Sequence, residues 1–258
     1  MFERVFLISL IILFIFNNAF ADDSIFTTYR DDGNSIVFDG KWTFEQEWKH
    51  ASEDIIKFSD GNQFSIKTAH DRKNLYVLID FLTSKKITKD SDYGMFCITS
   101  NSTKQNYAQN DDYCFRLTIG SKTAIVLQGG SVLASTNHYK KIQPIIPVTV
   151  AGGISDSNDR YNSIPHPTYE FKIPIELVGR SDDYGFYVSV FEAHTNHLYS
   201  WPNQVTSDEF SDPPPPSEWG HLVSPDKSLP EFEFSLPVLL SSIIIMIYLT
   251  RRRIFNHR

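Results

Sequence analysis

Hydrophobic and polar residues alternate in short segments along the middle of the chain, as in strands with one buried face. In YCFRLTI, Tyr113, Phe115 and Leu117 fall on one face, and Cys114 and Arg116 fall on the other. Similar segments between turn-forming residues lie at 35–40, 64–70, 74–82, 93–100, 123–130, 168–174 and 184–194. Helical signals are confined to 43–48 and 174–179. The pattern predicts an all-β fold: a single antiparallel β-sandwich, jelly-roll-like, with one or two short helices.

The N-terminal end breaks this pattern. Arg4 precedes a continuous apolar stretch, residues 5–16, and Ala19-Phe20-Ala21 supplies the small-x-small pattern of a signal-peptidase site. The stretch is shorter than the roughly 20 residues of a membrane-spanning helix. We therefore predict a secretory signal peptide over residues 1–21, with cleavage after Ala21.

A second apolar run closes the chain. Residues 234–250 are mostly aliphatic, and Arg251, Arg252 and Arg253 follow directly. Counted from Phe232, the run extends about 28 Å as a helix, enough for a thin bilayer span. A basic cluster at this place stays in the cytoplasm and stops transfer. The sequence predicts a transmembrane helix with a cytoplasmic tail, 251–258, and hence a body outside the cell; a buried core helix is the alternative.

The predicted exported body comprises a β-sandwich over 22–212 and a proline-rich linker with a sorting motif over 213–233. The whole chain has a formal charge of −7; residues 1–21 contribute 0 and residues 228–258 contribute +2, so the part between them carries about −9. This charge argues against nucleic acid or anionic lipid as a partner. It suits a soluble surface domain whose acidic loops hold a cation.

The two cysteines, Cys97 and Cys114, lie in neighbouring strand-like segments joined by a polar loop. Because an exported chain meets an oxidising environment, we predict a disulfide between them, with two buried free thiols as the alternative. The same loop contains Asn101 in the sequon Asn-Ser-Thr, which predicts N-glycosylation.

Acidic pairs in loops are candidate cation sites, because hard cations bind several oxygen ligands. Asp111 and Asp112, next to the Cys114 strand, are the pair held most firmly, and Ca²⁺ is the ion they suit. Asp156 and Asp159 form another such pair. Ordinary solvated turns are the alternative for all of them.

Aromatic side chains supply the candidate ligand-binding residues, because sugar rings stack on aromatic planes. Tyr199 and Trp201 share a face at the end of one strand, and Trp219 lies in the proline-rich segment. Packing in the core is the alternative for each. The sequence has no G-x-S-x-G, H-E-x-x-H or Walker motif, so we predict no catalytic residues and no enzyme.

A longer motif carries a resemblance to a known fold family. FDGKWTFEQEW and AHDRKNLYVLIDF are similar to the opening of the carbohydrate-binding module family 9-like and DOMON-like β-sandwich domains. The matching residues are Asp39, Gly40, Trp42, Glu47, Trp48, His70, Asp71, Leu75, Tyr76 and Val77. The resemblance implies a β-sandwich whose relatives bind sugars or haem.

The tail carries a second resemblance. Pro230-Glu231-Phe232, the apolar run and the arginines resemble the PEF-CTERM sorting signals of archaea, and YLTRRR resembles tails from ammonia-oxidising archaea. This resemblance implies an archaeosortase-like transpeptidase as a partner that exchanges the tail for another attachment. Glu233 departs from the proline often found after this motif, so retention of the tail as a helix stays open.

Together these features predict a non-catalytic binding module on the extracellular face of the cell membrane, with envelope carbohydrate as the candidate ligand. A haem- or metal-carrying redox domain of the DOMON-like kind is the first alternative, for which Met95 is the available methionine. A structural envelope protein is the second.

Overall fold

The computed structural model describes residues 23–32, 35–84, 86–101, 103, 105–131, 139–159, 163–202, 204–206 and 213–225. The predicted signal peptide with Ala21, the motif Pro230–Phe232, the transmembrane helix and the arginines 251–253 lie outside these residues. Within them, no helix has the length and apolar content needed to cross a membrane.

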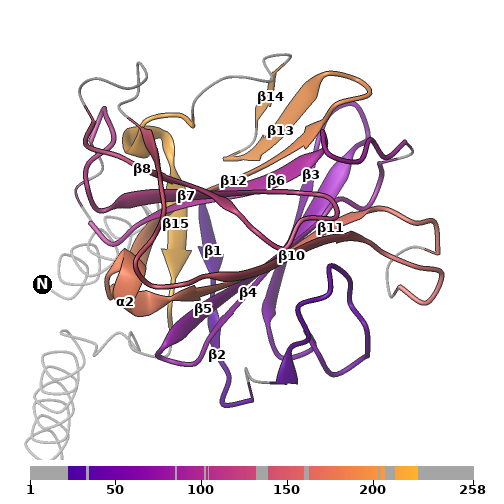
Figure 1. Ribbon diagram of the computed structural model, residues 1–258, viewed down its shortest axis with the longest axis horizontal. Helices are drawn as coiled ribbons and strands as arrows, with labels where there is room; N and C mark the ends of the chain where they lie inside the picture. The colour runs from indigo at the N-terminus through magenta and orange to yellow at the C-terminus, as the bar shows by residue number, and fades with distance from the viewer. Residues whose placement is uncertain are drawn as a thin grey trace, which may run out of the picture.

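The protein is a β-sandwich of two sheets, stacked face to face in Figure 1. The larger sheet, sheet A, contains β1 (Ser24–Phe26), β15 (Gly220–Val223), β12 (Asp183–Glu192), β6 (Tyr93–Thr99), β7 (Asp112–Thr118), β8 (Ile125–Gln128), β9 (Lys140–Ile142), β13 (His197–Trp201) and β14 (Gln204–Thr206). Sheet B contains β10 (Thr149–Ile154), β11 (Pro167–Pro174), β5 (Asn74–Asp80), β4 (Gln63–His70), β2 (Thr28–Tyr29) and β3 (Ser52–Lys57).

Most strand pairs are antiparallel; β1–β15 and β2–β4 are parallel. The long strand β12 has two partners on one edge, because its first half pairs with β15 and its second half with β13. The helix α2 (Ile175–Val178) follows β11 directly, between Pro174 and Gly179, as the sequence predicts. A single turn of 3₁₀ helix, η2 (Pro216–Glu218), precedes β15.

The main core lies between the sheets and is rich in aromatic side chains. The ring of Phe96 contacts those of Phe115 and Phe186 within sheet A and that of Phe171 in sheet B, and the rings of Phe96 and Phe171 are edge to face at 5.0 Å between centroids. All four side chains are fully buried. Edge-to-face pairs of this kind add to the stability gained from burying apolar area.

Each sheet also has a smaller hydrophobic cluster on its outer face. The cluster on sheet B joins Ala69, Tyr76 and Leu78 to Trp42 and Trp48 of the segment 35–51, which crosses that face (Figure 1, indigo). The cluster on sheet A consists of Tyr93, Met95, Cys97, Ala108, Cys114, Tyr139, Tyr187, Phe191, Leu198 and Trp219. Loops, rather than a third layer, therefore cover parts of both outer faces.

The structure confirms most predicted strands and corrects two points. Residues 35–40 are not a strand, because side-chain carboxylates rather than a neighbouring strand accept the N–H groups of Val37, Asp39 and Gly40. The sandwich also does not end at residue 212, since β15 lies beyond the prolines and pairs with both β1 and β12.

The predicted disulfide is confirmed. Cys97 and Cys114 are directly opposite each other in the β6–β7 pair and are bonded, and both are fully buried in the outer cluster of sheet A. The bridge thus joins two strands that already pair along their whole length.

Candidate binding site

A surface depression of about 380 Å³ lies between the segment 35–51 and the turn after β10. Trp42, Thr43, Phe44, Glu45 and Asn158 line it. Its volume is within the range of small-molecule pockets, and it combines aromatic rings with hydroxyl, carboxylate and amide groups.

The aromatic part of the depression has one covered ring and one open ring. Trp42 is only 9% exposed; its indole Nε1–H donates to the carbonyl of Phe44 (2.6 Å), and the ammonium of Lys67 lies 5.0 Å from its ring. Phe44 is 41% exposed, so its ring is available to a ligand. Trp42 therefore supports the loop that presents Phe44.

Two buried glutamates fix the loop on sheet B. Glu47 accepts the N–H groups of Val37 and Thr43, both at 2.7 Å. Glu170 of β11 accepts those of Asp39 (3.0 Å) and Gly40 (2.7 Å), together with the indole N–H of Trp48 (3.1 Å). Backbone N–H groups that would otherwise lack partners are satisfied in this way.

Burial controls the protonation of both glutamates. It raises the pKa of Glu47 despite the N–H donors from Val37 and Thr43. Burial, with a smaller contribution from nearby Glu47 and Asp39, raises the pKa of Glu170 to about 8 against the donors Gly40 and Trp48. These carboxylates hold the loop and lie behind the depression, and neither lines it.

Gly40 lets the loop approach the sheet closely. Its φ of +86° lies in the left-handed region, and a Cβ at this position would lie 2.5 Å from the amide nitrogen of Gly153. Lys41 then reaches the neighbouring turn, where its Nζ lies 3.3 Å from Asp156 Oδ2. Asp156 also accepts the N–H of Asn158 (2.8 Å), so an ion pair and a turn connect the two sides of the depression.

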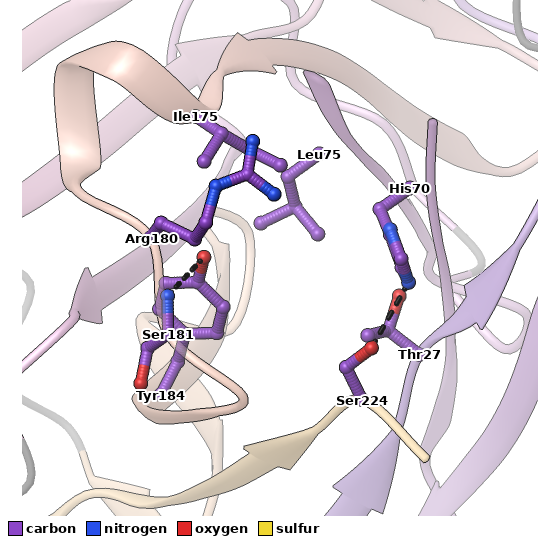
Figure 2. A pocket seen from close by; sticks show the side chains of 8 residues that line it. All are labelled: Thr27, His70, Leu75, Ile175, Arg180, Ser181, Tyr184 and Ser224. Atoms are coloured by element: carbon purple, nitrogen blue, oxygen red, sulfur yellow. Dashed lines mark hydrogen bonds between the residues drawn. The ribbon is translucent and has the colours of Figure 1, made fainter. Parts of the chain in front are cut away.

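A second cavity, shown in Figure 2, lies at the end of the sandwich between the sheets. It is lined by Thr27, His70, Leu75, Ile175, Arg180, Ser181, Tyr184 and Ser224. Its space of about 20 Å³ is close to that of a single water, so it is too small for an organic ligand. The bond between His70 Nε2 and Ser224 Oγ (3.0 Å) connects β4 to the end of β15 there.

The three aromatic residues predicted to bind a ligand are buried instead. Tyr199 and Trp201 share a face of β13, as predicted, but that face lies in the main core, where they are 1% and 6% exposed. Trp219 is 3% exposed in the outer cluster of sheet A, and its indole N–H donates to the carbonyl of Pro214 (2.9 Å). The prediction that these three rings stack on a ligand is therefore wrong. All three are packed in hydrophobic clusters, and none has a face open to solvent.

The other predicted residues have local roles in the described structure. Asp112 is buried and accepts the N–H of Gln109 at 2.6 Å, and burial raises the pKa of its carboxyl; Asp111 beside it is half-buried. The Asn101 side chain accepts the N–H of Thr103 in the β6–β7 loop. Met95, the candidate haem ligand, is 4% exposed within the outer cluster of sheet A. Calcium binding by Asp111 and Asp112 and glycosylation of Asn101 stay predictions.

Sequence reasoning missed Phe44 and Asn158 as binding residues. Phe44 lies in TFEQEW, which we interpreted as a helical turn, and Asn158 lies in a turn with no distinctive motif. Phe44 and Asn158 meet at the depression only in the folded chain.

No family model matches the sequence, and no curated protein matches it either. Two solved structures of a carbohydrate-binding module family 9 from Caldicellulosiruptor kristjanssonii, one with cellotriose and one with glucose, are similar in structure. Each is 16% identical over 78% of this chain, with a TM-score of 0.46; the match covers 93% of the cellotriose-bound chain and 95% of the glucose-bound chain. The ligands belong to those proteins, and similarity at this level does not assign one here.

Proposed function

We propose that this protein is a non-catalytic carbohydrate-binding module displayed at the cell surface, and that it binds sugar in the depression at Phe44. The observation that carries this proposal is an open aromatic ring surrounded by hydrogen-bonding side chains on a fixed loop. Sugars have apolar C–H faces and a rim of hydroxyl groups, so a ring with polar neighbours complements both parts.

The contacts divide between stacking and hydrogen bonding. Phe44 stacks on the face of one sugar ring, while Thr43, Glu45 and Asn158 exchange hydrogen bonds with its hydroxyl groups. The loop is held in place before binding by Glu47, Glu170 and the Lys41–Asp156 pair, so little conformational entropy is lost when the ligand arrives.

Surface display follows from the signal peptide and the tail that the sequence predicts. A chain exported through residues 1–21 and held by residues 234–250 places the sandwich outside the membrane, where envelope polysaccharide is the carbohydrate within reach. Attachment by an archaeosortase-like enzyme instead of the helix leads to the same location.

The test is binding of the purified full chain to a panel of gluco-, xylo- and manno-oligosaccharides and to envelope polysaccharide, measured by isothermal titration calorimetry. We expect Phe44→Ala to weaken binding about tenfold, or roughly 1.4 kcal/mol. Phe26→Ala is the matched control, because Phe26 is also an exposed phenylalanine (53%) but lies in β1. Absence of binding to the whole panel, or equal affinity of wild type and Phe44→Ala, would overturn the proposal.

A further inference from the structure

Three buried side chains with metal-binding groups meet at one end of sheet B. Asp80 is the last residue of β5, His166 immediately precedes β11, and Asp159 belongs to the turn after β10. One carboxylate oxygen of each aspartate and one ring nitrogen of His166 lie within 4.8 Å of one another. Figure 1 shows this end, where the β10–β11 hairpin extends beyond the sheet.

The fold places these residues through regular pairing. In the β5–β11 ladder Asp80 is opposite Thr168, and the Ser155 N–H donates to the His166 carbonyl at 2.9 Å, extending the β10–β11 pair. The side chains of His166, Asp80 and Asp159 are 0%, 1% and 2% exposed. The three side chains therefore belong to the protein interior and are not surface acids.

Hydrogen bonds orient the His166 ring. Its Nδ1 lies 2.8 Å from the carbonyl oxygen of Ile164 and 2.9 Å from the hydroxyl oxygen of Ser155; because a carbonyl only accepts and a hydroxyl can accept, a proton on Nδ1 suits both contacts. In the neutral ring, Nε2 then carries the lone pair. A histidine whose Nδ1–H is held by a backbone carbonyl is the usual arrangement when Nε2 binds a metal.

The lone pair of Nε2 is directed at the carboxylates. Nε2 lies 2.7 Å from Asp80 Oδ1 and 3.8 Å from Asp159 Oδ1. The shorter contact lacks hydrogen-bond geometry, and Nε2 has no hydrogen-bond partner among the described residues. Two electron-rich atoms at this separation repel each other unless a proton or a metal ion lies between them.

Asp80 also has a buried carboxylate oxygen without a partner among the described residues. Its Oδ1 accepts the hydroxyl of Thr168 at 3.1 Å, but its Oδ2 is buried and has no hydrogen-bond partner in the described structure. A buried carboxylate oxygen without a partner is unfavourable unless a cation or a proton compensates its charge.

The electrostatics of the cluster also favour positive charge. Burial alone lowers the pKa of His166, but the contact with Asp80, the Ile164 carbonyl and the Asp159 carboxylate together raise it. Burial raises the pKa of Asp80 despite the contact with His166. A bound cation would satisfy the carboxylate and the imidazole together.

We infer that Asp80, Asp159 and His166 bind one divalent transition-metal ion of the zinc class as a structural site. One imidazole nitrogen and two carboxylates suit zinc and its neighbours, whereas calcium and magnesium prefer oxygen ligands alone. Zinc bonds of about 2.0–2.2 Å place two ligand atoms at most about 4.4 Å apart, so only small shifts are needed. The site does not depend on what the depression binds.

Such an ion would join three segments of the chain at one point. It would attach the turn containing Asp159, and with it Asn158 at the edge of the depression, to the end of β5. Its primary effect is on the stability of the fold, which is measurable without any sugar.

The test uses the full chain purified without a histidine tag, stripped with a chelator and titrated with Zn²⁺ against a chromophoric competitor. We expect one Zn²⁺ per chain and an increase of several degrees in melting temperature with excess Zn²⁺. His166→Ala and Asp159→Asn should each weaken Zn²⁺ binding by roughly 100-fold or more, since even indirect partners of metal ligands contribute 10- to 100-fold.

The matched control is His221→Ala. His221 also contacts an aspartate, with Nδ1 2.8 Å from Asp183 Oδ1, but this pair lies at the surface without a third ligand among the described residues. This variant should bind Zn²⁺ like the wild type. Asp159→Asn changes a turn residue, so it still reports on the site if His166→Ala does not fold. The inference is overturned if the wild type binds no Zn²⁺ below about 10 μM, or if Asp159→Asn binds it as tightly as the wild type.

Discussion

Because Glu170 holds the segment 35–51 on sheet B, its protonation should make the stability of the protein depend on pH. This carboxyl group is fully buried on β11 and accepts three N–H groups. Burial raises its pKa from the ordinary 4.5 to about 8. A group with a folded-state pKa above its unfolded value binds more protons in the folded state, so stability falls as the pH rises from about 4.5 and levels off above about 8.

The size of the effect follows from the two pKa values. Since a pKa difference of one corresponds to 1.36 kcal/mol, the rise from 4.5 to about 8 costs the folded state roughly 5 kcal/mol at high pH. Between pH 5 and pH 9 the contribution of Glu170 should therefore fall by about 4 kcal/mol. This is a large part of the 5–15 kcal/mol that stabilises a typical domain.

Glu170→Gln isolates this contribution, because the amide does not titrate and its oxygen still accepts the N–H groups of Asp39 and Gly40. Urea unfolding followed by tryptophan fluorescence at pH 5, 7 and 9 gives the free energy of unfolding of both proteins. We expect the wild type to lose about 4 kcal/mol relative to the variant across this range. Glu176→Gln, at an exposed position on α2, controls for the loss of a charge.

A difference between wild type and Glu170→Gln that stays constant from pH 5 to pH 9 would refute the reasoning. It would mean that the three N–H donors keep Glu170 ionised in the fold and that their attraction exceeds the cost of burial. The loop would then be held by a charged acceptor rather than a neutral one.

Three further predictions concern the bridge, the loop and the ends. Replacing Cys97 and Cys114 together by serine should lower the free energy of unfolding by about 3 kcal/mol, measured in urea. Gly40→Ala should destabilise the protein by more than about 2 kcal/mol, whereas Gly61→Ala, with φ +89° but nothing within 4 Å of its Cβ, should cost about 1 kcal/mol; equal melting temperatures for the two would contradict the close approach. Mass spectrometry of protein from cells should place the mature N-terminus at Asp22, and a chain ending at Ser228 should be secreted and folded. An intact Met1 or an unfolded truncated chain would contradict these expectations, whereas a folded truncated chain that stays cell-bound would indicate that the domain itself binds a surface partner.

The central strands were predictable because each has enough residues to reveal its buried face. The β6, β7 and β12 segments are rich in aromatic and β-branched residues, and the pairing of Cys97 with Cys114 followed from their neighbouring positions. Short edge strands such as β2 and β9 have only two and three residues, too few for any period to appear. β10 was missed for a different reason: Gly152 and Gly153 remove its side-chain pattern where the Gly40 loop approaches.

The binding and metal sites were less predictable, because each depends on residues far apart in the sequence. Asp159 was noted as an acidic turn residue, but Asp80 reads as the end of a hydrophobic strand and His166 as one histidine between two prolines. Their meeting depends on the register of β5 against β11, which no local pattern specifies. The prediction of the ligand-binding aromatic residues failed for a similar reason. Trp201 and Phe44 both precede turns in the sequence, but tertiary packing buries Trp201 and leaves Phe44 exposed.

Several residues of the motif that suggested a fold family hold loops, while Leu75 and Val77 pack in the main core. Asp71 accepts the N–H of Asn74 (2.6 Å) and the hydroxyl of Tyr76 (2.8 Å), which closes the β4–β5 turn. Glu47 and Trp48 fix the segment that carries Phe44. The matching residues therefore account for where the loop lies. Phe44 falls within the motif but is not one of the matching residues, and Asn158 lies outside the motif.

Because the matching residues support the fold and Phe44 lies at the surface, variants of the two kinds test different things. Substituting the motif residues would lower stability and ligand binding together, so a loss of binding in such variants would say nothing specific about a ligand. Phe44 is exposed and makes the sharper test, because Phe44→Ala removes the open ring and leaves Glu47, Glu170 and Gly40 in place. Unchanged melting temperature with weakened sugar binding in this variant would assign the function to the depression itself; weakened binding with a lowered melting temperature would instead mean that Phe44 also stabilises the loop.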